Sequence, residues 1–548
     1  MRLRAGHDEV AARPGPSRWG ASRWGASRWG ASRWGYGAAA VLAGALPAPA
    51  FPAPSLWWLA YAALVPWLLL LATAPTGRRA ALYGWLGGTG FMLAVHHWLL
   101  PNLHVFILVL AALLGLLWAP WGWLVRWAFA QARRSRGRAL LACAVVPSGW
   151  LLIEVVRSWE GLGGPWGLLG ASQWQVAPAL RVAALGGVWL VTLLVVAVNT
   201  AVALLVVVPP VRTAAVVALV VCGVAMGSAW MWVPPPETVG RVRVGVVQPG
   251  VIGGPDGPER RFARGEELTR TLAGRDVDLV VWGESSVGAD LAARPDLSAR
   301  LAALSREVGA EVLVNVDARR SDLPGIFKSS VLVGPRGPTG DRYDKMRLVP
   351  FGEYVPARAV LGWATSVGRA AEEDRRRGTR PVVMAVGEGA ELRIGPLVCF
   401  ESAFPDMSRR LVRDGAGLLV AQSATSTFQE SWAPAQHASL AALRAAETGR
   451  PMVHATLTGV SAAYGPDGGR VGAPLGTDRS AAAVYELPLA AATTPYTRYG
   501  DWPVWAALAV LAGTAVAAVF RRVRRAPAPG SPVRPARTAR GSAARPGR

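Results

Sequence analysis

The apolar residues of this chain are concentrated before residue 233 and after residue 501, and the charged residues are concentrated between these two positions. Hydrophobic residues make up 52% of the 548 positions, and charged residues only 17%. An ordinary soluble protein carries more charge than this. The distribution therefore predicts a membrane protein in which one large soluble segment interrupts a series of apolar spans.

Eight apolar stretches are candidates for membrane-spanning helices, of which the first is short and contains proline. They cover residues 36–52, 54–74, 80–100, 104–130, 139–157, 182–208, 212–232 and 502–520. A helix needs about 20 apolar residues to cross a bilayer. We therefore expect a multi-pass α-helical membrane domain of about eight spans.

These spans divide the chain into five parts. A basic arm, in which Ser-Arg-Trp-Gly-Ala repeats with a period of five, is expected to be disordered, as is a basic tail. The expected order is the arm at 1–35, a seven-span domain at 36–232, a soluble domain at 233–501, a last span at 502–520 and the tail at 521–548.

Arginines gather on one side of the spans. They stand between spans two and three, between spans four and five, at the start of span seven and after span eight, and include Arg78, Arg133, Arg212 and Arg521. The positive-inside rule then places both termini in the cytoplasm and residues 233–501 on the outer face of the cytoplasmic membrane. The same rule explains the basic tails, so the net charge of +23 is no argument for a nucleic-acid partner.

The soluble segment reads as one α/β domain. A helix is expected at Ala433–Thr448, where apolar and small residues alternate with polar ones. Strands are expected at Val242–Val247, Val277–Trp282, Glu311–Val316, Ser329–Val333, Leu392–Cys399, Gly417–Ala421 and Met452–Thr456. Mixed strands and helices over this length favour a layered sandwich over a barrel.

Three residues in this domain suggest acyl-transfer chemistry, because each stands at the end of an extended segment. Cys399 follows the apolar run Ile394 to Val398, Glu284 follows Asp-Leu-Val-Val-Trp-Gly, and Lys345 precedes Met-Arg-Leu-Val-Pro-Phe-Gly-Glu. A thiol titrates near ~8.5 and needs a base or a cation beside it to act as a nucleophile. We expect Glu284 to be the base, with a pKa raised by its apolar neighbours, and Lys345 to stabilise the thiolate and the oxyanion.

No metal or cofactor is expected. The six histidines show no ligand-like spacing, and the chemistry of a thiol, a base and a cation requires neither.

Glu284, Lys345 and Cys399 follow one another along the chain in the same order as the catalytic Glu, Lys and Cys of the nitrilase superfamily. The domain therefore resembles that superfamily. The flanking spans, together with Leu-Val-Pro-Phe-Gly-Glu-Tyr-Val-Pro at 348–356 and Arg-Ala-Ala-Glu-Thr-Gly-Arg-Pro at 444–451, make the whole chain similar to the membrane-embedded apolipoprotein N-acyltransferase family. The resemblance implies an α-β-β-α sandwich outside the membrane. Gly283, Phe400 and Leu457 stand where that family usually has Pro, Tyr and Asn.

The resemblance also implies a reaction. Cys399 would attack a phospholipid ester, and the α-amino group of the diacylglyceryl-cysteine of an apolipoprotein would then take the acyl chain from the thioester. Glu353 would orient Lys345, and Glu401 would be a supporting carboxylate near the thiol, with a surface salt bridge as the alternative for Glu401. The expected partners are therefore a phospholipid donor and diacylglyceryl-modified apolipoproteins.

Two other functions remain open at this level. One is a membrane-anchored amidase, in which water resolves the acyl-enzyme. The other is a non-catalytic scaffold for another envelope enzyme, for instance a lipid-linked glycosyltransferase. The intact set of Glu284, Lys345 and Cys399 favours an enzyme over a scaffold.

Overall fold

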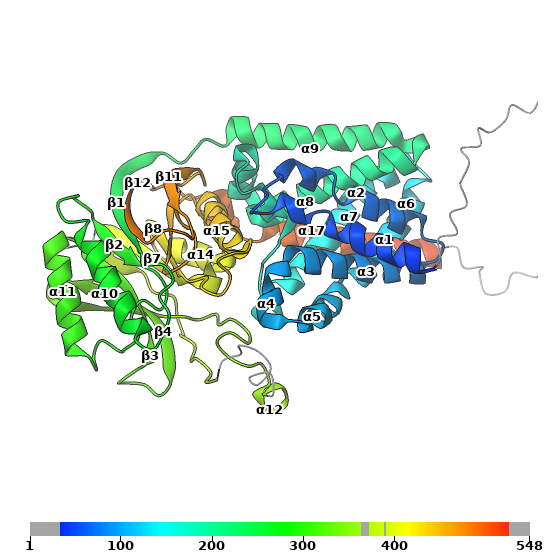
Figure 1. Ribbon diagram of the computed structural model, residues 1–548. Coiled ribbons are helices and arrows are strands. Elements are labelled where there is room, and N and C mark those ends of the chain that lie inside the picture. Colours follow the sequence, from blue (N-terminus) through cyan, green and yellow to red (C-terminus); the bar gives the residue numbers. More distant parts are fainter. Residues whose placement is uncertain (1–32, 363–371, 388, 390, 525–548) are drawn as a thin grey trace, which may run out of the picture.

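The computed structural model describes residues 33–362, 372–387, 389 and 391–524. An α/β part and a helical part lie side by side, at the left and right of Figure 1. Most of the basic arm and of the basic tail lies outside the described residues, so the disorder expected there is untested. The first helix begins at Arg33, within the segment assigned to the arm.

The α/β part contains two six-stranded sheets. In the first sheet β1 pairs with β2 and β2 with β3 in parallel, and the other neighbours are antiparallel. Its strands, in spatial order, are β12 (Ala481–Ala490), β1 (Thr238–Gln248), β2 (Leu279–Trp282), β3 (Glu311–Arg319), β4 (Ile326–Gly334) and β5 (Gly337–Asp344).

The second sheet has a similar pattern, with β7, β8 and β9 parallel. Its spatial order is β11 (Arg470–Leu475), β10 (Ser461–Tyr464), β9 (Met452–Thr456), β8 (Leu418–Ser423), β7 (Leu392–Val398) and β6 (Met384–Val386). In both sheets the parallel strands end at one edge, which is where polar side chains can gather.

The two sheets face each other across an apolar core. Val244 and Leu313 of the first sheet and Ile394 and Val420 of the second belong to this core, and all four are fully buried. The outer faces are covered by helix pairs, α10 (Gly257–Arg270) and α11 (Pro295–Val308) on one side, and α14 (Pro405–Arg413) and α15 (Ala433–Thr448) on the other. This is an α-β-β-α sandwich, as expected.

The expected elements of this domain are confirmed. All seven predicted strands exist, and helix α15 has the predicted bounds. One difference concerns the site, because β7 ends at Val398 and Cys399 starts a short 3-10 helix, Cys399–Ala403. The nucleophile candidate is therefore on a turn, one residue beyond the strand.

The helical part is a bundle around an aromatic centre. Trp67, Trp118, Trp121 and Trp150 are all nearly inaccessible, and their rings meet mainly edge to face at centroid distances of 5.1–5.9 Å. The main helices are α1 (Arg33–Ala45), α2 (Val65–Thr73), α3 (Gly77–Val95), α4 (Leu100–Leu103), α5 (Phe106–Gly115), α6 (Trp118–Ala132), α7 (Arg136–Arg157), α8 (Ala177–Val207), α9 (Arg212–Trp232) and α17 (Trp502–Val523).

The number of spans differs from the expectation. Among the described residues, four helices (α7, α8, α9 and α17) are long and apolar enough to cross a membrane, and α5 with α6, bent by 40°, would make a fifth. The stretch at 36–52 gives a helix that ends at Ala45, because prolines follow at 47, 49 and 52. The stretch at 54–74 gives only the short helices Trp57–Tyr61 and Val65–Thr73. The structure therefore supports a multi-pass helical domain but not a count of eight.

Candidate active site

Three turns, each at the end of a strand, bring the predicted residues together. Glu284 lies two residues after β2, Lys345 directly after β5, and Cys399 directly after β7. Two of these turns contain a non-glycine residue in the left-handed region, with φ of 51° at Cys399 and 55° at Ser285. Such residues are uncommon and cluster at active sites, where the surrounding structure holds them.

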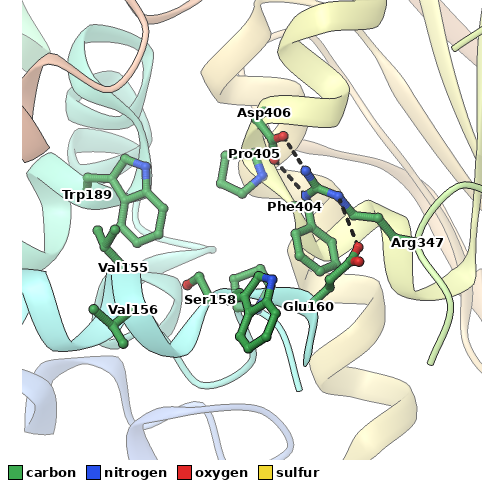
Figure 2. A pocket seen from close by; sticks show the side chains of 11 residues that line it. Val155, Val156, Ser158, Glu160, Trp189, Arg347, Phe404, Pro405 and Asp406 are labelled. Atoms are coloured by element: carbon green, nitrogen blue, oxygen red, sulfur yellow. Dashed lines mark hydrogen bonds and ion pairs between the residues drawn. The ribbon is translucent and has the colours of Figure 1, made fainter. Parts of the chain in front are cut away.

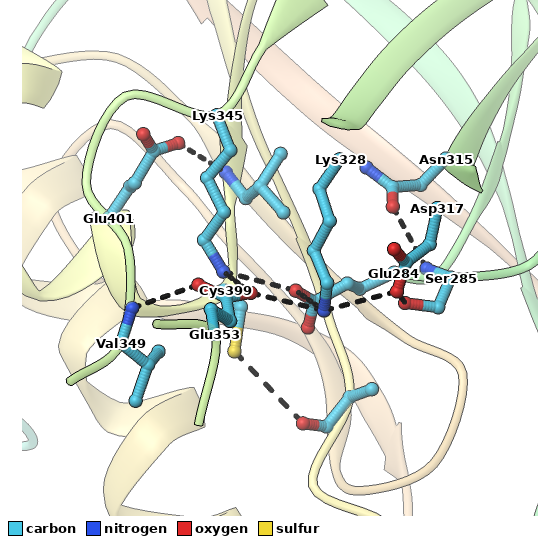
Figure 3. Close-up of polar contacts among 12 residues, drawn as sticks. Glu284, Ser285, Asn315, Asp317, Lys328, Lys345, Val349, Glu353, Cys399 and Glu401 are labelled. Carbon is cyan, nitrogen blue, oxygen red and sulfur yellow. Dashed lines mark hydrogen bonds and ion pairs between the residues drawn. The ribbon is translucent and has the colours of Figure 1, made fainter. Parts of the chain in front are cut away.

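A closed ring of ion pairs forms the centre of the site (Figure 3). The Nζ atom of Lys345 lies 3.1 Å from Oε1 of Glu284 and 2.7 Å from Oε1 of Glu353. A second lysine, Lys328 of β4, contacts the same two oxygens at 2.9 Å and 3.1 Å. Positive and negative groups thus alternate around the ring, and Glu353 lies against Lys345 as expected.

Lys328 is not among the residues predicted from the sequence. This residue lies in the middle of a strand, where a lysine usually extends into solvent. The signal available in the sequence is its neighbours, since Phe327, Ser329 and Ser330 are all buried and leave few exposed positions along this part of β4.

The electrostatics of Glu284 correct the sequence-based expectation. Burial alone would raise the pKa of this carboxyl, as its apolar neighbours suggest. The ammonium groups of Lys328 and Lys345 outweigh burial and lower the pKa to about 2. Glu284 is therefore a carboxylate at neutral pH. The pKa of Lys345 is raised, because Glu284 and Glu353 outweigh the effect of burial on its ammonium group.

Cys399 is partly exposed and lies beside the ring in Figure 3. Its Sγ atom is 4.0 Å from the carbonyl oxygen of Ala424. Burial and the charge of Glu284 raise the pKa of the thiol to about 12, although Lys345 acts in the opposite direction. The thiol of the free protein is therefore protonated at neutral pH.

Glu401 supports the turn of Cys399 from inside the protein. Its side chain is fully buried, which excludes the alternative of a surface salt bridge. It accepts hydrogen bonds from the backbone N–H groups of Met346 (2.7 Å), Arg347 (3.0 Å) and Val398 (2.8 Å), and from the hydroxyl of Tyr343 (2.8 Å). One carboxylate thus ties the segment after Lys345 to the residue before Cys399.

A histidine supports the same turn from the other side. Nε2 of His437, in α15, lies 3.0 Å from the carbonyl oxygen of Cys399 and 3.0 Å from Oγ of Ser402. Burial lowers the pKa of His437 to about 4, so the ring is neutral at pH 7. Its ring also packs against Trp166, in the loop after α7, with centroids 5.3 Å apart.

An open pocket lies where the sandwich meets the membrane helices (Figure 2). Its volume is about 330 Å³, and its walls come from the end of α7, from Trp189 of α8, from Arg347 and from the start of α14. The lining is apolar except for Ser158 and an ionic cluster, in which Arg347 pairs with Asp406 at 2.5 Å and with Glu160 at 3.9 Å. Arg347 follows Lys345 by two residues in the chain, whereas no member of the ring lines the pocket.

Two family models match this chain. Residues 43–201 match the apolipoprotein N-acyltransferase N-terminal domain, and residues 243–494 match the carbon-nitrogen hydrolase family. The first covers most of the helical part, and the second covers nearly the whole sandwich.

Curated relatives match across both parts. Apolipoprotein N-acyltransferase of Geobacter metallireducens is 30% identical over 469 residues, which cover 81% of this chain and 87% of the relative. The enzyme of the same name from Azotobacter vinelandii is 32% identical over 473 residues, covering 82% and 89%, and that from Vibrio vulnificus is 28% identical over 469 residues, covering 82% and 90%. The chain therefore belongs to the apolipoprotein N-acyltransferase family.

Proposed function

We propose that this chain transfers a fatty acyl chain from a phospholipid to the N-terminal α-amino group of the diacylglyceryl-cysteine of apolipoproteins, through a thioester on Cys399. The observation that carries the proposal is the position of Cys399. Its thiol lies on a turn in the left-handed region, beside a buried ring of two lysines and two glutamates. Membership of the apolipoprotein N-acyltransferase family supports the choice of substrates.

In the first step, a bond forms between Sγ of Cys399 and the ester carbonyl carbon, and the bond from that carbon to the glycerol oxygen breaks. The proton of the thiol passes to Glu284 and from there to the leaving lysophospholipid oxygen. Both described ion pairs of Glu284 use Oε1, so Oε2 is the oxygen assigned to the proton. Lys345 donates two of its three N–H groups to carboxylates and has a third for the oxyanion.

In the second step the amine of the lipoprotein attacks the thioester. A bond forms between nitrogen and the carbonyl carbon, the bond to Sγ breaks, and the amine proton returns to the sulfur through Glu284. A thioester suits this step, since a thiolate leaves more readily than an alkoxide when an amine attacks. Glu353 keeps Lys345 in place throughout, and Glu401 keeps the turn of Cys399 in place.

We also propose the membrane arrangement expected from the sequence, with eight spans, both termini in the cytoplasm and residues 233–501 on the outer face of the cytoplasmic membrane. The close packing of α1 against α3 supports membrane insertion of these helices. A Cβ atom on Gly44 would come within 1.9 Å of the carbonyl oxygen of Gly87. Contacts between small residues of this kind are typical of helices packed in a bilayer.

The division of the chain follows the same proposal, with the arm at 1–35, the seven-span domain at 36–232, the catalytic domain at 233–501, the last span at 502–520 and the tail at 521–548.

The pocket in Figure 2 is the place where we expect the phospholipid to approach, since it joins the end of α7 to the segment after Lys345. Its apolar walls suit acyl chains, and its ionic cluster suits a headgroup.

The family membership favours acyl transfer over the alternatives of an amidase and of a scaffold for a lipid-linked glycosyltransferase. An amidase of small soluble substrates needs no N-terminal domain of this kind, and residues 43–201 match one that is named for N-acyltransferases. A scaffold has no need of a buried ring of charges, which is costly to keep inside a protein.

The test is an acceptor assay with purified protein in phospholipid vesicles. One peptide carries an N-terminal diacylglyceryl-cysteine with a free α-amino group, and the control carries the same group acetylated. We expect the free peptide to gain the mass of one acyl chain, lysophospholipid to appear in equal amount, and the acetylated peptide to stay unchanged. Release of free fatty acid without peptide acylation would favour the hydrolase instead.

A further inference from the structure

Lys328 is the one member of the ring for which the Glu-Lys-Cys resemblance provides no role. Its side chain is only 13% exposed, and its Nζ atom is within ion-pair distance of three carboxylates. These are Glu284 at 2.9 Å, Glu353 at 3.1 Å and Asp317 at 3.7 Å. Three carboxylate partners indicate an electrostatic role for Lys328, in addition to its packing in β4.

The two lysines pair with the same two carboxylate oxygens. Oε1 of Glu284 accepts hydrogen bonds from both Nζ atoms, at 2.9 Å and 3.1 Å. Oε1 of Glu353 accepts a hydrogen bond from Lys345 at 2.7 Å and forms an ion pair with Lys328 at 3.1 Å. The ring therefore holds two positive and two negative charges. Without Lys328, two buried carboxylates would share one ammonium group, a situation that strongly favours protonation of one of them.

We propose that Lys328 is a positioning residue of the acyl-transfer reaction, which keeps Glu284 and Glu353 ionised together around Lys345. This inference rests on the proposed function. Its consequence is that Oε2 of Glu284 remains able to accept the thiol proton at and below neutral pH, and that Lys345 is held between two anions.

The other charged groups around Glu284 cannot replace Lys328. Cys399 and His437 face Glu284 but carry no positive charge at neutral pH. Glu401 is an acid, and its pKa is raised by burial. Arg375 is the remaining cation near this cluster, and it lies 3.4 Å from Asp317. Among the described residues, Lys345 would be the cation left to pair with both glutamates.

Two variants separate charge from shape. Lys328→Met removes the charge and keeps the length of the side chain, and Lys328→Arg keeps the charge. Lys328→Gln, which is neutral but still donates hydrogen bonds, replaces Lys328→Met if that variant does not fold. Folding is checked by thermal unfolding of each purified protein in detergent.

The kinetic test measures the rate of thioester formation with phospholipid between pH 5.5 and pH 8. The ratio of the Lys328→Met rate to the wild-type rate cancels the effects of groups that titrate in both proteins. We expect this ratio to fall about tenfold as the pH decreases over this range, because one glutamate then binds a proton. We expect the ratio for Lys328→Arg to stay constant.

A lipid-free test uses difference infrared spectroscopy at pH 6. Each variant spectrum has the wild-type spectrum subtracted, so that carboxyl groups protonated in both proteins, such as Glu447, cancel. We expect an additional C=O stretching band of a protonated carboxyl for Lys328→Met, its loss when Glu284→Gln and Glu353→Gln are added to that variant, and no additional band for Lys328→Arg. A pH-independent rate ratio, or the absence of the band in Lys328→Met, would overturn the inference. Failure of wild type to form a thioester would defeat the proposed function, and the infrared band would still decide the role of Lys328.

Discussion

At the scale of single residues, the proton affinities of Glu284 and Cys399 are opposed. The pKa of Glu284 is lowered to about 2 and that of Cys399 is raised to about 12, so the resting site holds a carboxylate beside a neutral thiol. Removing the proton from sulfur becomes favourable only when charge moves onto a substrate oxygen near Lys345.

The role of Glu284 as base gives a direct prediction. Glu284→Gln keeps the shape of the side chain but cannot accept the proton, so we expect the rate of thioester formation to fall by about 100-fold to 10,000-fold. The matched control is Glu486→Gln, which removes a partly exposed carboxylate whose ion-pair partner is Arg241. The control should retain the wild-type rate. A Glu284→Gln rate within a few-fold of wild type would mean that another group is the base.

Glu401 gives a prediction about the turn of Cys399. Glu401→Ala leaves the buried N–H group of Val398 without its acceptor, at a cost of about 1–3 kcal/mol, and also frees the partly buried N–H groups of Met346 and Arg347. We expect a loss of at least about 100-fold in thioester formation, because the thiol no longer keeps its position. Tyr343→Phe removes one bond to the same carboxylate and should cost less than about tenfold. Equal effects of the two variants would contradict the assigned role.

The sequence predicts Glu284 and Cys399 because each follows a strand whose apolar pattern is clear. Lys345 follows β5, whose sequence is mostly polar, and is predicted from the motif at 348–356 that it precedes. The sequence does not predict Lys328, since the pairing of β4 with β3 and β5 decides which strand residues meet Glu284. It also gives the wrong direction for the pKa of Glu284. The apolar neighbours are visible in the sequence, but the two ammonium groups reach Glu284 only through the fold.

At the scale of elements, helix α8 is broken in its first half. Gly186 and Gly187 have non-helical backbone angles, and the N–H group of Val188 donates to Oε1 of Glu447 at 2.7 Å. Glu447 belongs to α15 and also accepts from Arg444 at 2.9 Å. A side chain of the sandwich therefore satisfies a backbone group that the break frees in a membrane helix.

This contact predicts a dependence of stability on pH. Burial raises the pKa of Glu447 to about 7, against the effect of Arg444. An unfolded glutamate titrates near ~4.3. The folded state therefore binds a proton more tightly than the unfolded state between these values, so this contribution to stability is largest at low pH and is lost as the pH rises to about 7.

The measurement is the thermal midpoint of wild type and Glu447→Gln in detergent, from pH 5 to pH 8. The amide side chain of the variant would keep an acceptor for the N–H group of Val188 but would not titrate. We expect the midpoint of wild type, relative to that of the variant, to decrease between pH 5 and pH 7 and to level off above pH 7. A difference that stays constant with pH would show that Glu447 does not titrate in this range.

Element bounds are predicted well where the apolar pattern is regular and poorly where glycine and proline interrupt it. The strands of the sandwich and helix α15 are examples of the first case. The stretches at 36–52 and 54–74 are examples of the second, since apolar composition alone does not reveal that they form short helices.

Gly283, a departure from the family pattern, is explained by packing, because a Cβ atom there would lie 1.9 Å from the backbone nitrogen of Leu457.

At the scale of the whole molecule, the two parts share one apolar core. Buried residues of α15 and of the second sheet, including Leu443 and Leu419, belong to the same cluster as Trp150 and Val195 of the membrane helices. The α14 and α15 layer is therefore covered by the helical bundle, while α10 and α11 lie on the far side of the sandwich in Figure 1. The pocket is on the side that faces the bundle, since its walls come from α7, α8 and α14.

The topology gives a prediction at this scale. In a chain whose three cysteines are replaced by serine, Glu259→Cys on exposed α10 and Arg134→Cys in the exposed loop before α7 provide one label site on each side. We expect a membrane-impermeant maleimide to label Glu259→Cys in intact spheroplasts and Arg134→Cys only after lysis. The opposite pattern would reverse the proposed orientation.

The central claim is the thioester on Cys399, and intact-mass analysis of purified protein incubated with phospholipid tests it most directly. The wild-type protein should gain the mass of one acyl chain, and hydroxylamine should remove it. The Cys399→Ala protein, shown to be folded by its thermal unfolding, should gain no mass. An acyl adduct that persists in Cys399→Ala, or no adduct in folded wild type with any phospholipid, would contradict the account.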